Sequence, residues 1–202
     1  MALARQHNMT VFIKKYADHL LLALNNQPLF LAVIWSQACL ESGYGGSDAA
    51  KNHNNFFGVE INNRIKTFSS PKDAFEYQAN LFQNPNLPYI SHGVLTATTA
   101  YAQVRAIADS GYYSMTNDET LATNWKGSGG VPKGWVWNGY TWTGSVWKGS
   151  HFTAKESSDH YYNNLKGFID DALLLLPIGK VNDAGLASIQ RSIFNLVAQK
   201  LP

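Results

Sequence analysis

The sequence has little of several features that would place a protein in a specialised class. It contains a single cysteine, Cys39, so it cannot form an internal disulfide, and the apolar neighbours of Cys39 predict a buried thiol. Charged residues make up only 15% of the chain and no lysine or arginine cluster is present, which argues against a nucleic-acid partner. The six histidines are scattered without a metal-ligand spacing such as HExxH, so we expect no metal and no other cofactor.

The sequence also lacks a continuous apolar segment of membrane-spanning length. The apolar stretch from Leu20 to Leu40 is broken by the polar residues and proline of NNQP at positions 25–28. A membrane helix needs about 20 apolar residues, and a signal peptide places its apolar core soon after its basic residues. We therefore expect no membrane insertion and no signal peptide, although a chain already trimmed of its leader would look the same.

What is present is typical of one soluble globular domain. The chain has 202 residues, 45% of them hydrophobic, a net charge of +2 and a pI near 8.6. This length suffices for one substantial core, and we expect a monomer. The mild positive charge fits an anionic polymer such as a bacterial cell wall.

Hydrophobic periodicity predicts a mainly α fold of the α+β class. Apolar residues at helical spacing predict helices over residues 10–24, 71–82, 97–109, 156–176 and 183–200. Asn26 and Pro28 predict the start of a further helix, apolar nearly all round, from Leu29 to Leu40 at the centre of the domain. Residues 47–51 predict one helical turn, and Asn62-Asn63 predicts the turn of a short hairpin.

The segment from residue 124 to 151 has a different composition. It contains five of the six tryptophans, and residues 137–151 follow the repeat WNGYT-WTGSV-WKGSH. Asn138-Gly139 is a strong tight-turn signal, which predicts hairpins and hence an inserted Trp-rich β-subdomain. Exposed tryptophans would pack on sugar rings, whereas buried ones would hold the subdomain together, and a repeat of five allows both.

Glu41 lies where the apolar run PLFLAVIWSQACL ends. A carboxylate at a helix C-terminus meets the negative end of the helix dipole and unpaired carbonyl groups. Together with partial desolvation by the apolar neighbours, these effects favour the protonated form and raise the carboxyl pKa. A carboxyl that is protonated near neutral pH can serve as general acid toward a glycosidic oxygen. The alternative is an exposed residue that merely ends a helix.

The residues around Glu41 resemble a known family. The pattern A-x-L-E-S-G-x-G-x-S at residues 38–47, followed by N-N-x-F-G at 54–58, resembles the glucosaminidase family of peptidoglycan hydrolases. That family includes autolysins, phage lysins and the hydrolase domain of the flagellar rod protein. FSSPKDAFEYQANLF, QNPNLPY and AQVRAIADSGYYS continue the resemblance, which resumes at SDHYY from residue 158. It implies a lysozyme-like helical fold with a catalytic glutamate at the end of a central helix.

On this resemblance, residues 1–202 form a single catalytic domain. Residues 115–157 are a Trp-rich insertion, and residues 180–202 carry a C-terminal helix. The resemblance implies that Glu41 is the general acid and that Tyr112, which matches the tyrosine of the family motif G-Y-A-T, faces the cleft as a catalytic residue. The expected substrate-binding residues are Gln37, Ser42, Asn55, Phe57, Tyr113, Trp137 and Trp142.

The chain departs from the family at the second carboxylate. Many members carry a second glutamate on a longer hairpin, whereas only nine residues separate Gly58 from Phe68 here, and Glu60 is the sole carboxylate among them. Glu60 is a candidate second catalytic residue; the alternative is a surface strand residue. A second carboxylate about 5 Å from Glu41 would retain the configuration at the anomeric carbon, and one about 6.5 to 9.5 Å away would invert it. The substrate's N-acetyl group could also take the place of the second carboxylate as nucleophile.

The resemblance implies an endo-β-N-acetylglucosaminidase that cleaves peptidoglycan glycan strands. Three alternatives stay open: a lytic transglycosylase, a muramidase on the same glycan, and a non-catalytic glycan-binding or virion structural protein. We expect action on the bacterial cell wall, in the periplasm or outside the cell. The missing signal peptide fits phage encoding with release by a holin, or delivery by a secretion system.

Overall fold

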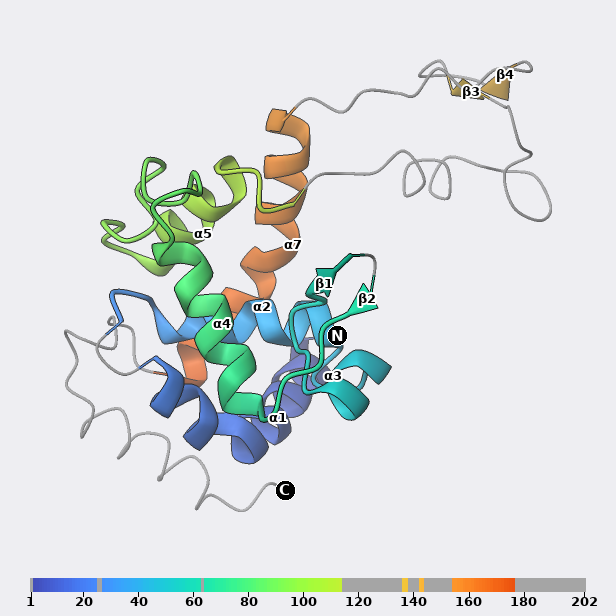
Figure 1. Ribbon diagram of the computed structural model, residues 1–202, viewed down its shortest axis with the longest axis vertical. Coiled ribbons are helices and arrows are strands. Elements are labelled where there is room, and N and C mark those ends of the chain that lie inside the picture. The colour runs from blue at the N-terminus through green and yellow to red at the C-terminus, as the bar shows by residue number, and fades with distance from the viewer. Residues whose placement is uncertain are drawn as a thin grey trace.

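The computed structural model describes residues 2–24, 27–62, 64–113, 136–137, 142–143 and 154–176. These residues form a mainly α fold with a small antiparallel hairpin (Figure 1), which confirms the predicted class and is consistent with a lysozyme-like architecture. No helix among the described residues is long and apolar enough to cross a membrane.

Helix α1 (Ala2–Ala23) begins eight residues before the predicted start at residue 10. The hydrophobic residues in its first two turns show weak helical periodicity, but contacts with other parts of the fold stabilise these turns. Met9 is fully buried, and near the N-terminus the Arg5 guanidinium forms an ion pair with Asp171 of helix α7 (Ala154–Leu175). The packing of α1 on α7 therefore extends the helix beyond the segment that the sequence pattern marked.

Helix α2 (Leu31–Ser42) is the central helix, in contact with α1, α7, α4 (Pro71–Gln83) and α5 (Ala100–Asp109). The prediction of a central apolar helix is confirmed, but the predicted start at Leu29 with Asn26 as cap is wrong. The N-cap residue is Phe30, whose side chain cannot cap, and its backbone N–H donates to Gln103 Oε1 of α5 at 2.9 Å. The buried Gln103 side chain of α5 thus accepts a hydrogen bond at the start of α2, where a local cap was expected.

Two short elements follow α2, close to its C-terminal end (Figure 1). Helix α3 (Asp48–His53) is capped by Ser47, whose side chain accepts from the N–H of Ala50. Strands β1 (Glu60–Ile61) and β2 (Arg64–Ile65) pair antiparallel, and Asn62 has φ +53° at the turn. The hairpin predicted from Asn62-Asn63 is therefore confirmed.

Helices α4 and α5 begin at side-chain caps. Ser70 Oγ accepts from the N–H of Asp73, with Pro71 as the first residue of α4, as the sequence predicted. Thr99 caps α5 in the same way, so this helix starts at residue 100 and not at 97. Both helices then turn their apolar faces inward, toward α2.

An aromatic cluster joins α1, α2 and α4 in the core. Phe12 lies 4.7 Å from Trp35 between ring centroids, and Phe75 stacks on Phe56 at 5.4 Å. These four side chains are at most 2% exposed. They fix α2 rigidly, and with it the residue at its C-terminal end.

In the Trp-rich segment, strands β3 (Val136–Trp137) and β4 (Trp142–Thr143) pair antiparallel, with Trp137 opposite Trp142. These strands flank Asn138-Gly139, so the predicted hairpin is confirmed. The predicted helix over residues 183–200 lies outside the described residues, as does most of the predicted insertion, which stays a prediction.

Candidate active site

Glu41 occupies the last turn of α2 and is the one exposed residue of that helix. Leu40 is half-buried and every other residue of α2 is buried. The helix ends at Gly43, which has φ +56° and donates its N–H to the carbonyl of Cys39. The hydrophobic burial of α2 thus holds the backbone of Glu41 in place while its side chain stays open to a ligand.

Two phenols from distant segments lie near Glu41. Tyr112 follows α5, Tyr161 belongs to α7, and their ring centroids are 5.3 Å apart. Burial raises the pKa of both phenols, and the negative charge of Glu41 raises each further, so the carboxylate is within electrostatic reach of both hydroxyls. Both phenols are therefore protonated at neutral pH and can donate hydrogen bonds.

Each phenol hydroxyl accepts a hydrogen bond from a buried glutamine. Gln37 Nε2 of α2 donates to the hydroxyl of Tyr161 at 2.8 Å, and Gln78 Nε2 of α4 donates to that of Tyr112 at 3.0 Å. Gln37 and Gln78 are at most 1% exposed. Among the described residues, neither amide carbonyl oxygen has a hydrogen-bond partner.

Three predicted substrate-binding residues are buried parts of the framework. Ser42 Oγ donates to the carbonyl of Ala38 and accepts from the N–H of Gly45, and Asn55 bridges the two ends of the hairpin. Phe57 packs edge-on against Phe75. Ser42 and Asn55 are 1% exposed and Phe57 is 6% exposed, so these three side chains, like that of Gln37, are packed into the framework around the end of α2, and their roles in substrate binding stay predictions.

Tyr113 extends the aromatic surface beside Tyr112. Its ring lies parallel to those of Tyr161 and His160, with centroids 5.6 and 5.9 Å apart. Tyr113 is half-buried and His160 is exposed. The row of rings leads from the buried Tyr161 through the half-buried Tyr113 to the exposed His160, a form suited to packing on the faces of sugar rings.

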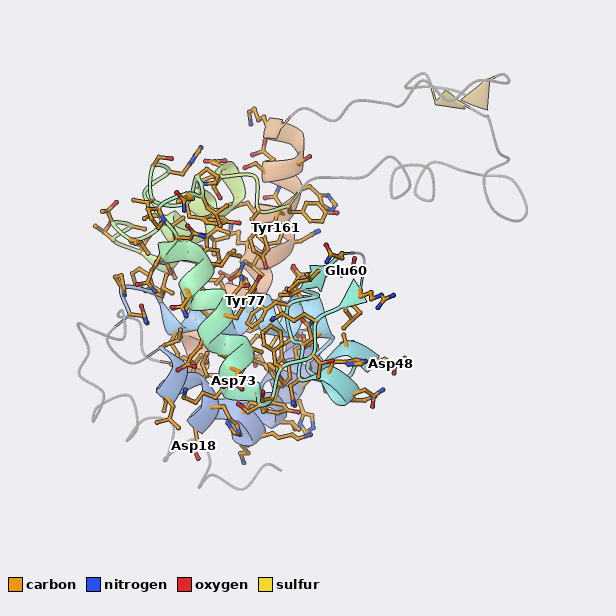
Figure 2. The ribbon with its side chains drawn as sticks, viewed as in Figure 1. Asp18, Asp48, Glu60, Asp73, Tyr77 and Tyr161 are labelled. Carbon is orange, nitrogen blue, oxygen red and sulfur yellow. The ribbon has the colours of Figure 1, made fainter. Side chains whose placement is uncertain are left out.

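Glu60 lies on β1, opposite Ile65 in the hairpin, and is exposed. Figure 2 shows Glu60 on the hairpin and Tyr161 on α7. Trp137 and Trp142 are paired backbone positions of β3 and β4, and their roles in substrate binding stay predictions. Within the described residues, no group of three or more His, Cys, Asp or Glu side chains lies together as a metal site would require.

Sequence reasoning missed Tyr161 and Gln78 as site residues. Tyr161 falls within the helix predicted over residues 156–176, and no local pattern reveals that it meets Gln37, which is 124 positions away. Gln78 left a weak signal, because a polar residue sits between Phe75, Ala79 and Phe82 on the buried face of α4. A buried amide there needs a hydrogen-bond partner, and Tyr112 provides it.

The chain matches a known protein family. The family model Glucosaminidase, described as mannosyl-glycoprotein endo-beta-N-acetylglucosaminidase, matches residues 17–174. This range runs from within α1 to the end of α7 and contains every residue of the site described above. No curated protein and no solved structure matches the chain.

Proposed function

Because this chain belongs to the glucosaminidase family of glycosidases, we propose that it hydrolyses the glycan backbone of peptidoglycan at N-acetylglucosamine, with Glu41 as general acid. The family supports the coarser statement, a glycosidase that degrades peptidoglycan. The observation that carries the finer one is the position of Glu41: an exposed carboxyl at the end of a buried helix, near the half-buried Tyr112 and the buried Tyr161.

In this proposal, the Glu41 carboxyl gives its proton to the glycosidic oxygen as the bond to the sugar C1 breaks. The new O–H bond forms on the leaving sugar, and the electron pair of the old O–H bond stays on the Glu41 carboxylate. Water then provides the oxygen that bonds to C1, and the proton that this water loses returns to the site, so the net reaction is hydrolysis. Tyr112 faces this carboxylate from the loop after α5. Tyr113, Trp137 and Trp142 provide aromatic faces for the neighbouring sugars, and the protein acts as a monomer at the cell wall.

The decisive experiment compares the wild-type protein with Glu41→Gln on purified sacculi. We expect loss of muropeptide release by at least about 100-fold, because the amide cannot donate the proton that a general acid provides. Glu76→Gln is the matched control, since Glu76 lies on the surface of α4 in an ion pair with Lys72. Full activity of Glu41→Gln would remove Glu41 from the mechanism.

Mass spectrometry of the products identifies the bond that is cut. The proposal predicts new reducing ends on N-acetylglucosamine. Anhydro-muramic ends would instead indicate a transglycosylase, new muramic reducing ends a muramidase, and binding to sacculi without release a non-catalytic protein. A high-mannose glycoprotein belongs in the same assay, because the matched family's description names that glycan.

The second catalytic group is tested at Glu60. As the sole carboxylate between Gly58 and Phe68, and exposed on β1, Glu60 is the proposed partner of Glu41. We expect Glu60→Gln to lower kcat by about 100-fold without a change in Tm. Retained activity, together with inhibition by a thiazoline analogue of N-acetylglucosamine, would contradict this role and favour participation of the substrate's own acetamido group.

A further inference from the structure

Two glutamine–tyrosine hydrogen bonds join four segments of the fold in a paired arrangement. Gln37 of α2 holds the hydroxyl of Tyr161 from α7, while Gln78 of α4 holds the hydroxyl of Tyr112 after α5. The two phenol rings pack on each other at 5.3 Å between centroids. Tyr161 and Gln78 have no assigned role so far.

The spacing of Gln37 and Glu41 along α2 places the glutamine–tyrosine pairs near the Glu41 carboxyl. Gln37 and Glu41 are four residues apart, so their side chains lie on the same face of the helix, one turn from each other. The hydroxyl that Gln37 holds must therefore lie near Glu41. Tyr112 shares this position because it packs directly on Tyr161.

Each of the two phenol hydroxyls can still donate one hydrogen bond. A phenol hydroxyl carries one proton to donate and lone pairs with which to accept. Each glutamine N–H uses an accepting site, so the proton of each hydroxyl is left for another group. Burial raises the pKa of both phenols, and among the described residues the other titratable groups that act on them are Glu41 and Tyr89. The hydroxyls therefore keep their protons through the neutral range.

Glutamine is energetically unfavourable at a buried position that has only a structural role. Both amide carbonyl oxygens are buried without a partner among the described residues, which an apolar side chain of the same size would avoid. What an apolar side chain could not do is donate to a phenol oxygen and fix the direction of its O–H bond.

We propose that Tyr161 acts as a second phenol of the active site and that Gln37 and Gln78 are positioning residues, which turn the O–H bonds of Tyr161 and Tyr112 toward the Glu41 carboxyl. The phenols stabilise the carboxylate that forms as Glu41 gives its proton to the glycosidic oxygen. They donate hydrogen bonds and transfer no proton, so the balance of the reaction is unchanged. This inference rests on the proposed role of Glu41 as general acid.

The test measures kcat, KM and the pH profile of Tyr161→Phe, Gln37→Met and Gln78→Met on a soluble glycan oligomer. We expect each variant to lower kcat by about 10-fold or more with little change in KM, because the lost interaction strengthens in the transition state. Loss of a donor also destabilises the Glu41 carboxylate. The alkaline limb, which reports its deprotonation, should therefore move to higher pH by about one unit.

The double variant Gln37→Met/Tyr161→Phe separates positioning from general stabilisation. If Gln37 acts through Tyr161, the double variant should be no slower than Tyr161→Phe alone. Tyr162→Phe is the matched control for the phenol, because Tyr162 lies next along α7 and packs against Arg105. Gln83→Met is the control for the amide on α4, since Gln83 bonds only to the carbonyl of Ala79 among the described residues.

Two outcomes would overturn the inference while leaving the function intact: an unchanged pH profile in Tyr161→Phe, or multiplicative losses in the double variant. Tyr161→Phe removes a single oxygen from a packed ring, so its result decides the matter even if a methionine variant fails to fold. Failure of the proposed function has a different signature, which is full activity of Glu41→Gln.

Discussion

Asn55 illustrates how one buried polar residue can organise the segment that follows α2 and α3. Its Nδ2 donates to the carbonyls of Val59 and Lys66 at 2.8 and 2.9 Å, and its Oδ1 accepts from the N–H groups of Phe57 and Val59. The side chain thus replaces the backbone partners that a strand of only two residues cannot supply. The base of the hairpin that carries Glu60 depends on this residue.

At the residue scale we therefore predict that Asn55→Ala destabilises the protein by about 2 to 4 kcal/mol, because buried backbone groups lose their partners. Urea unfolding followed by circular dichroism measures the free energy of unfolding. Asn86→Ala is the control, because Asn86 is exposed and makes a local turn contact with Asn84. A cost below about 0.5 kcal/mol would show that water replaces these bonds.

At the scale of the element, the end of α2 depends on residues that tolerate a left-handed backbone. Gly43 has φ +56° and Gly45 has φ +75°, with Tyr44 between them at φ +58°. A Cβ added at Gly43 meets nothing within 4 Å, whereas one at Gly45 would lie 3.0 Å from the buried ring of Phe12. The turn that exposes Glu41 is thus tied to the core through Gly45.

These two glycines give a matched pair of variants. Gly43→Ala should cost about 1 kcal/mol, the strain of an alanine in the left-handed region. Gly45→Ala adds a clash with a core ring that cannot move freely, so we expect a cost of about 2 to 4 kcal/mol. Thermal and urea unfolding of both variants compare the two values. An equal loss in the free energy of unfolding for both variants would mean that the Phe12 ring moves aside to accommodate the new methyl group.

At the scale of the whole molecule, α7 completes the site and closes the fold. It brings Tyr161 to Tyr112 and packs against α1, α2 and α5. Its far end is held by Asp171, which is paired with Arg5 and also accepts from Gln6 Nε2 at 3.2 Å. The first and last described helices are therefore linked, although they lie far apart in the chain.

We predict that Asp171→Asn destabilises the protein by about 1 to 3 kcal/mol. The Asp171 side chain is 5% exposed and that of Arg5 is 35% exposed, so the cost lies between those of a surface pair and a fully buried pair. Asp170→Asn is the matched control, because Asp170 is the preceding residue of α7, is exposed, and bonds to the hydroxyl of Tyr101. A similar urea midpoint for both variants would contradict the prediction.

The sequence by itself determined the features that depend on neighbouring residues. The period of apolar residues marked α2, α4 and α5, the Ser70-Pro71 pair marked the start of α4, and Asn62-Asn63 marked the hairpin. The motif around Glu41 pointed to the family that the match over residues 17–174 shows. Each of these signals is local, because caps, turns and helical faces are set within a few residues.

The tertiary structure alone decided which distant side chains meet. It replaced the expected Asn26 cap with Gln103, extended α1 to Ala2, and paired Gln37 with Tyr161 and Gln78 with Tyr112. None of these contacts has a signature in sequence spacing, because they follow from how the helices pack around α2. Glu41 was visible in the sequence as a charge that ends an apolar helix, and the resemblance also named Tyr112 and Gln37, whereas Tyr161 and Gln78 became visible once α4 and α7 were folded against α2.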